Sequence, residues 1–209
     1  MHEKVLPKHS LDLLDRLGRD TSPLLSGWTL AGGTGLGFRL GHRVSEDLDF
    51  FRTDDLDVRG LHDVLRPHGD YETLQESVHT LTVITHKTKL SFFRVRDPFL
   101  FRADPHRFFT VADVRDIALM KLVAISGRGS RKDFADLYVI LRGPPSLEDY
   151  FDLLPRKYGP SRINRYHILK SLTYFDDAES EPMPRMLVPF KWKDCRAFFV
   201  RQARAIVLP

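Results

Sequence analysis

The residues best suited to chemistry lie between positions 32 and 51, where a pair of glycines is followed by two aspartates. Asp47 and Asp49 are two positions apart in Asp-Leu-Asp-Phe-Phe, a run with the apolar character of a β-strand. Because side chains alternate along a strand, both carboxylates should project from one face, with Leu48 and Phe50 on the other. Two adjacent carboxylates repel each other unless a cation lies between them, and hard oxygen ligands beside a phosphate suit Mg²⁺. We therefore predict a Mg²⁺ site at Asp47 and Asp49.

The glycine pair predicts a phosphate site. Residues 28–31 have the character of a short strand, and Gly32 and Gly33 allow a tight turn and close approach of a ligand to the backbone. Thr34 is expected to cap the following helix, whose free amides would attract phosphate. The segment is neither a Rossmann loop, because Phe38 stands where the third glycine would fall, nor a P-loop, because Gly-Lys-Ser/Thr is absent.

A lysine in an apolar stripe is the next candidate. The spacing predicts a helix from residue 113 to about residue 126, and Lys121 shares one face of it with Val114, Ile117, Ala118 and Ile125. An unpaired buried ammonium group is costly, so Lys121 needs an anion. A triphosphate and a structural carboxylate both satisfy that requirement.

A second helix is expected to begin near Arg131 and to carry Asp133 and Asp136 close together beside an apolar stripe. Carboxylates one turn apart among apolar residues are candidates for a site. Acids in a first turn are also favourable for electrostatic reasons alone, so that structural role stays open.

The remaining pattern predicts the elements that must position these groups. Helices are expected over 9–19 and 57–66, and strands over 71–75, 80–85 and 89–95 as antiparallel neighbours in one sheet that also contains the Asp47 strand. Helical periodicity prevails from residue 111. A last helix over 192–207 has an apolar side and a basic outer face, which fits packing or RNA binding. The sequence thus predicts an α+β fold, with a sheet lobe over 1–110 and a helical lobe over 111–209 that completes the active site.

Composition fits a globular protein of one core or two small lobes. The chain has 209 residues, 42% hydrophobic and 29% charged, and its net charge of +4 permits RNA or nucleotide binding without requiring it. Cys195 is the single cysteine, which excludes an internal disulfide and a cysteine-based zinc cluster. None of the nine histidines has metal-ligand spacing, and His42 is expected in an exposed loop. Without a signal peptide or a long apolar run, we expect a cytoplasmic protein with no membrane partner.

Two segments together resemble a known family. Residues 30–34 with 43–51, and residues 121–125 with 131–138, resemble the AbiEii/AbiGii/MenT group of nucleotidyltransferase toxins, within the polymerase-β-type nucleotidyltransferase superfamily. The connector at 171–184 and the last helix are similar too, so the resemblance covers nearly the whole chain. It implies a nucleotidyltransferase-like mixed or antiparallel sheet flanked by helices, followed by a helical C-terminal lobe.

The resemblance also implies an activity, in which an NMP is transferred from an NTP to an acceptor and pyrophosphate leaves. Asp47 and Asp49 would hold Mg²⁺, Lys121 would contact phosphates, and Asp133 would orient or deprotonate the acceptor hydroxyl, with Asp136 as a possible additional member. The positions expected to bind the nucleotide are Gly32, Gly33, Thr34, Ser45, Lys121, Arg128 and Arg131. A phosphate on Ser45 would add negative charge beside the two aspartates and block metal and NTP.

By the same resemblance the acceptor is RNA, with the 3′ end of tRNA as the expected site. The protein would then be the toxin of a toxin–antitoxin or phage-defence pair, with an antitoxin protein or a kinase as its counterpart. One departure is that the run over 89–95 contains no acid, whereas many enzymes of the superfamily take a third carboxylate from such a strand. A catalytically weak binding module is therefore one alternative. A nucleotidyltransferase acting on a protein or small-molecule hydroxyl is another.

Overall fold

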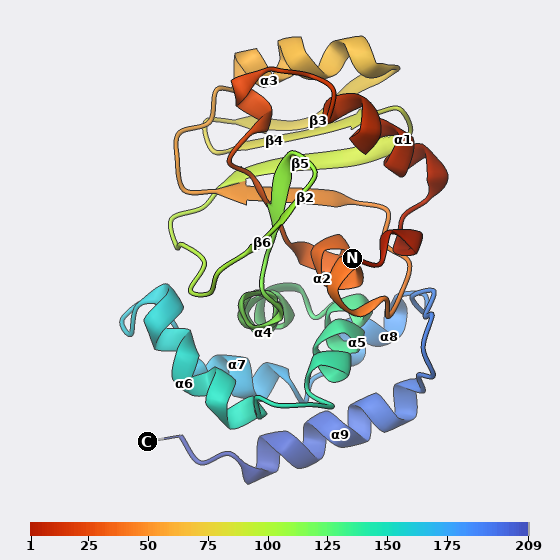
Figure 1. The fold of residues 1–209 in the computed structure, drawn as a ribbon. Helices are drawn as coiled ribbons and strands as arrows, with labels where there is room; N and C mark the ends of the chain where they lie inside the picture. Colours follow the sequence, from red (N-terminus) through yellow and green to blue (C-terminus); the bar gives the residue numbers. More distant parts are fainter. Residues whose placement is uncertain (209) are drawn as a thin grey trace. The chain divides into compact units, whose positions relative to one another are not determined.

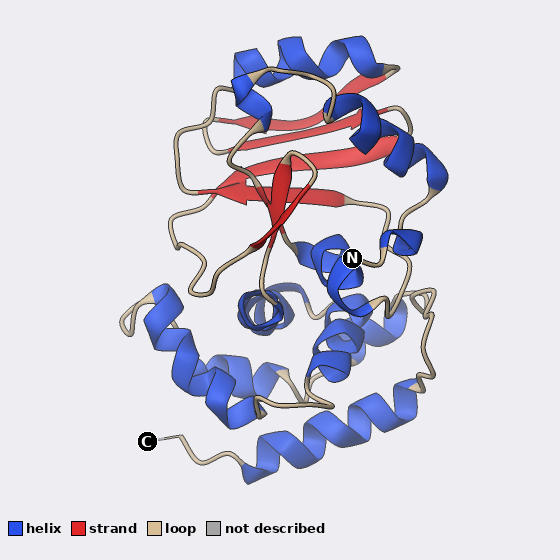
Figure 2. Ribbon diagram, in the orientation of Figure 1, coloured by secondary structure: helices blue, strands red, loops and turns tan. Residues whose placement is uncertain are grey.

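The computed structural model describes residues 1–208, which form two compact units with their boundary along the chain between Asp113 and Val114. The sequence places this division at residue 110. The first unit contains a sheet and helices, and the second contains helices (Figures 1 and 2). Among the described residues, no helix is both long and apolar enough to cross a membrane.

The first unit is built on a seven-stranded mixed sheet with the order β3-β4-β5-β2-β1-β7-β6. Its strands are β1 (Thr29–Leu30), β2 (Leu48–Arg52), β3 (Tyr71–Ser77), β4 (Thr80–Thr85), β5 (Thr88–Arg94), β6 (Asp104–His106) and β7 (Phe109–Val111). β2 pairs antiparallel with β1 and parallel with β5, so the strand that follows Asp47 lies in the interior of the sheet. The antiparallel order β3-β4-β5 is as predicted.

One face of this sheet supplies the core of the unit. Leu48 and Phe50 of β2 are fully buried, and the Phe50 ring stacks on Phe92 with centroids 5.3 Å apart. The helices of this unit are α1 (Lys8–Leu17), α2 (Gly32–Leu40) and α3 (Val58–Leu65). The α1 and α3 leucines belong to the same apolar cluster, which explains the helical spacing of the sequence there.

The second unit is a bundle of helices. They are α4 (Val114–Arg128), α5 (Arg131–Ile140), α6 (Leu147–Tyr158), α7 (Arg165–Ser171), α8 (Asp176–Ser180) and α9 (Trp192–Ala205). Phe134 of α5 is fully buried, and its ring centroid lies 5.1 Å from that of Phe175 and 5.4 Å from that of Phe199 in α9. Cys195 is buried beside it, and its thiol donates weakly to the Phe134 carbonyl at 3.7 Å, so its role is that of a small core residue.

The predicted α+β class, with a mixed sheet and a following helical region, is confirmed. Two strands have no counterpart in the prediction, β6 and β7, which form a hairpin just before the helical unit. Each has three residues, too few for a period-two pattern to stand out. β7 becomes a strand because it pairs in parallel with β1, a contact between residues about 80 positions apart.

Candidate active site

In the sheet unit, the start of α2 packs directly against β2, the strand that contains Asp49 and follows Asp47. Gly32 has a left-handed backbone (φ +62°), and a Cβ added there would lie 2.7 Å from Oδ2 of Asp49. The Ala31 amide donates to the Asp49 carbonyl at 3.0 Å, which fixes this end of β2 beside the helix. The two glycines therefore allow a close approach, and the first group they approach is a carboxylate of this chain.

Thr34 has a different role from the one predicted. Ala31 is the N-cap residue of α2, without a side-chain cap among the described residues, and Thr34 is the third residue of the helix. Its buried hydroxyl donates to the backbone carbonyl of Asp47. The prediction of a Thr34 helix cap was wrong, because α2 already begins at Gly32, two residues before Thr34. Thr34 instead fixes the backbone at Asp47.

Arg43 is a member of this cluster that the sequence analysis did not assign. Arg43 is 5% exposed, and its guanidinium donates through Nη1 to the Val44 carbonyl at 3.0 Å and lies where a Cβ on Gly33 would be. Ser45 Oγ is 3.0 Å from the same position. The only signal in the sequence was the place of Arg43 in the motif, two residues before Ser45. His42 is fully buried, so the prediction of an exposed loop histidine was wrong.

The two aspartates alternate as predicted with buried residues. Asp47 immediately precedes β2 and Asp49 lies in it, and both are half-buried, whereas Leu48 and Phe50 are fully buried. Within residues 1–208 there is no group of three or more His, Cys, Asp or Glu side chains placed to bind a metal. Two carboxylates still fit Mg²⁺, because this ion keeps several waters and takes further oxygens from substrate phosphates.

The position beside Asp49 on β5 is occupied by a serine. Ser91 is the register partner of Asp49, is 2% exposed, and accepts a hydrogen bond from the Thr82 hydroxyl at 3.3 Å. β5 therefore presents a hydroxyl where a third carboxylate could have been.

In the helical unit, a buried cluster of charges joins α4 and α5. Lys121 Nζ lies 2.7 Å from Asp133 Oδ1 and 2.6 Å from Asp136 Oδ2, and both carboxylates are fully buried. Arg128 binds Asp133 through Nε at 2.7 Å, while its side chain is 59% exposed. Of the two anions predicted for Lys121, the structure supplies the carboxylates. Two cations and two carboxylates neutralise each other, and the exposed member is Arg128.

These charges set the protonation of Asp133. Burial alone would raise the pKa of this carboxyl, but the positive charges of Lys121 and Arg128, and the hydrogen bonds they donate, lower the pKa below its usual range. Asp133 is therefore ionised at neutral pH and is a weak base.

Arg131, predicted to neutralise phosphate, ties down the connector before α9. Its Nε donates to the Ala178 carbonyl at 2.7 Å and its Nη2 to the Glu179 carbonyl at 2.9 Å. Glu181 accepts from the Ser130 hydroxyl at 2.7 Å and from the Arg131 amide at 2.9 Å, so it serves as the cap that begins α5. The connector therefore holds the turn of α5 that carries Asp133.

Comparisons with known proteins agree with this architecture. The chain matches the family described as nucleotidyl transferase AbiEii toxin, type IV toxin–antitoxin system, over residues 12–205. An uncharacterized protein of Aquifex aeolicus (strain VF5), aq_aa25, is 36% identical over 181 residues, which cover 84% of this chain and 85% of the relative.

Two solved structures share the fold. The nucleotidyltransferase toxin MenT4 from Mycobacterium tuberculosis is 16% identical, with a TM-score of 0.56 over 94% of this chain and 80% of that chain. JHP933 from Helicobacter pylori is 16% identical, with a TM-score of 0.51 over 97% and 89%.

The family match settles the class of reaction. Enzymes of this class take an NTP as substrate and generally use a divalent metal, and a type IV system pairs the toxin with an antitoxin. The match extends over nearly the whole chain and includes both charged clusters. The chain belongs to the AbiEii nucleotidyltransferase toxin family and is a nucleotidyltransferase.

Proposed function

We propose that the protein uses Mg²⁺ to transfer an NMP from an NTP to RNA, at the 3′ end of tRNA, and acts in the cytoplasm as a toxin of a toxin–antitoxin or phage-defence system. The observation that carries the proposal is the packing of Gly32 against Asp49. The start of α2, which in this proposal attracts phosphate, packs against a carboxylate of the Asp47/Asp49 pair, and this combination would suit a metal-bound triphosphate.

In this proposal Asp47 and Asp49 would hold the metal. When bound, Mg²⁺ neutralises phosphate charge and polarises the phosphoryl group. The amides of Gly32 and Gly33 attract the triphosphate. Arg43 lies against Gly33 and adds positive charge there, and the Thr34 hydroxyl holds the Asp47 backbone in place.

The helical unit would contribute the second cluster to the transfer. Arg128 is its exposed cation and would contact phosphate, while Lys121 stabilises negative charge from its buried position. Asp133 would orient the acceptor hydroxyl. Its lowered pKa makes it a poor proton acceptor, which favours orientation over deprotonation. Asp136 would position Lys121 through their ion pair.

Ser45 offers a point of regulation. Its hydroxyl lies next to the Gly33 backbone and the Arg43 guanidinium, and the side chain is 8% exposed. A phosphate added there by a kinase would compete with the triphosphate for the same positive charge. We expect Ser45→Asp to lose NTP binding in equilibrium dialysis, and full retention would contradict this part of the proposal.

The function is tested with purified protein, total tRNA, Mg²⁺ and each α-³²P NTP in turn. We expect labelled tRNA with the parent, and at least about 100-fold less with Asp47→Asn/Asp49→Asn. Glu46→Gln is the matched control, because Glu46 is an exposed acid beside the pair and should leave labelling unchanged.

The alternatives give different results in the same assay. Absence of label on tRNA but label on a protein or an aminoglycoside would reassign the acceptor. NTP binding without label on any acceptor would favour the weak binding module, which the serine beside Asp49 makes a specific alternative.

A further inference from the structure

We infer that the helical unit binds the phosphodiester backbone of an RNA strand in a basic groove that leads to Arg128. This inference rests on the proposed function for its RNA acceptor. The groove consists of three hollows of about 730, 530 and 290 Å³ that share lining residues. The first two share Val200 and Arg204 of α9, and the second and third share Lys170 of α7.

The charge of the groove is almost entirely positive. Asp177 is the single acid lining these three hollows, against six basic side chains: Arg128, Lys170, Lys193, Arg196, Arg201 and Arg204. Arg196 is paired with Glu179 and Arg128 with Asp133, but the other four have no carboxylate at ion-pair distance within residues 1–208. A row of exposed, uncompensated cations is the electrostatic footprint of a polyanion site.

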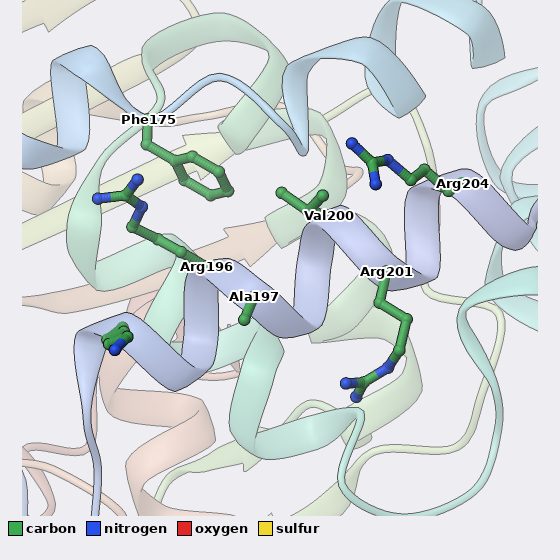
Figure 3. Close-up of a pocket in the computed structure, with 7 residues that line it drawn as sticks. Phe175, Arg196, Ala197, Val200, Arg201 and Arg204 are labelled. Atoms are coloured by element: carbon green, nitrogen blue, oxygen red, sulfur yellow. The ribbon is translucent and has the colours of Figure 1, made fainter.

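The cations follow a line rather than a single point. Lys193 and Arg204 are 11 positions apart on α9, which is about 16 Å along the helix axis. Figure 3 shows the Arg196 guanidinium beside the Phe175 ring and Arg204 about two turns further along the helix. A small anion would need one cluster, whereas a strand of phosphates can meet charges spread over this length.

Aromatic rings lie between the charges. Tyr166 lines the middle hollow and is 62% exposed, and Tyr174 lines the third and is 51% exposed. Exposed rings beside cations allow unpaired bases to stack, which distinguishes an RNA strand from an acidic protein surface.

The groove also has a direction. Its third hollow is lined by Arg128 and Gly129 at the end of α4, and Arg128 binds the buried Asp133 at 2.7 Å. An RNA strand lying along α9 and α7 would therefore have one end at the residues proposed to orient the acceptor hydroxyl. We assign the groove to the segment that precedes the accepting 3′ end.

The test compares two triple variants that remove equal charge. The groove variant, Lys170→Gln/Arg201→Gln/Arg204→Gln, removes three positive charges from the groove. The control variant, Arg142→Gln/Arg156→Gln/Arg185→Gln, removes three exposed basic residues of the same unit that line none of the three hollows. The Kd for 5′-fluorescein-labelled total tRNA is measured by anisotropy without NTP at several salt concentrations. Circular dichroism confirms that both variants are folded.

We expect the Kd of the groove variant to rise about ten-fold or more and its slope of log K against log salt to fall in magnitude by about 2, with both values unchanged in the control. Equal affinities of the two variants, or no tRNA binding by the parent, would overturn the inference. Displacement of tRNA by polyglutamate as effectively as by unlabelled tRNA would assign the groove to an acidic protein and would also overturn it.

Failure of the groove inference can be distinguished from failure of the proposed function. If the parent labels no tRNA but the groove variant still loses tRNA affinity, the groove is supported and the proposed reaction fails. If tRNA is labelled and the groove variant keeps the parent KM for tRNA, the reaction stands and the groove is rejected. Binding of NTP should be the same in all three proteins.

Discussion

At the scale of single residues, the site of the sheet unit depends on what is missing at Gly32. A side chain there would need a left-handed backbone and would lie 2.7 Å from Oδ2 of Asp49. Glycine is therefore needed at this position for two reasons: its left-handed backbone conformation and the absence of space for a side chain. The carboxylate of Asp49 can occupy its position only because the first turn of α2 has no side chain there.

Gly32→Ala should therefore lower the free energy of unfolding by about 2 kcal/mol, since a left-handed alanine is strained. It should also weaken NTP binding about ten-fold or more by displacing Asp49. Gly143→Ala is the control, because a Cβ there meets no atom within 4 Å. Urea unfolding and equilibrium dialysis measure the two effects, and an unchanged NTP affinity would show that the Asp49 position is not needed.

The charged cluster of the helical unit combines stability with chemistry. Lys121 is 5% exposed and lies between two fully buried carboxylates. Removing one carboxylate takes an opposite charge away from a lysine in a buried environment. The same pairing keeps Asp133 ionised. A substitution at Asp133 therefore changes both the free energy of unfolding and its dependence on pH.

Asp133→Asn should lower the free energy of unfolding by about 2–4 kcal/mol at neutral pH. The native pKa of Asp133 is depressed, so its stabilisation is present above the ordinary carboxyl pKa and is lost as the pH falls through the native value. The difference in the free energy of unfolding between parent and variant should be constant above about pH 5 and should decrease below about pH 4. Urea titrations followed by circular dichroism at each pH test this. A stability difference that increases in acid would contradict the lowered pKa of Asp133.

At the scale of elements, α5 begins where a distant segment supplies its cap. Ser130 is the N-cap by position but makes no side-chain cap bond among the described residues. Glu181, 51 residues away, accepts from the Ser130 hydroxyl, and Arg131 donates to the Ala178 carbonyl of the same segment. The first turn of α5 is thus defined by the connector, and Asp133 lies in that turn.

Glu181→Gln should lower the free energy of unfolding by about 1–2 kcal/mol, because a charged acceptor at a helix N-terminus is lost. It should also reduce the transfer rate, since Asp133 is positioned by the same turn. Glu148→Gln, an exposed acid in the first turn of α6, should cost only a few tenths of a kcal/mol. Equal losses of unfolding free energy in the two variants would show that the Glu181 cap stabilises the protein no more than an ordinary exposed acid in a first turn.

At the scale of the whole molecule, the chain consists of two compact units, each with its own core and its own charged cluster. The sheet unit carries Asp47 and Asp49, and the helical unit carries Lys121, Asp133 and Arg128. A ligand that binds the native protein raises its unfolding temperature by mass action. Thermal unfolding therefore reports NTP binding without any assumption about the acceptor.

An NTP at 100 times its Kd, with Mg²⁺, should stabilise the parent by about 2.7 kcal/mol. Asp47→Asn/Asp49→Asn should lose this gain, and so should the parent in EDTA, whereas Glu46→Gln should keep it. Differential scanning fluorimetry with and without metal makes the comparison. Stabilisation that is equal in EDTA would show that the aspartates do not act through a metal.

The sequence determined what depends on local periodicity. The alternation of Asp47 and Asp49 with buried residues, the antiparallel strands from residue 71 to 94, and the helices α4, α5 and α9 follow from spacing along the chain. The helices α6, α7 and α8 were not predicted. The need of Lys121 for an anion followed in the same way, because its neighbours on the helix are apolar.

The tertiary structure decided which distant groups meet. Asp133 and Asp136 became the partners of Lys121, Glu181 became the cap of α5, and β7 became a strand by pairing with β1. Thr34 turned toward the Asp47 carbonyl and Arg43 toward Gly33. Residue spacing does not predict contacts between segments far apart in the chain. Such contacts are fixed only when the whole core packs and every buried polar group must find a partner.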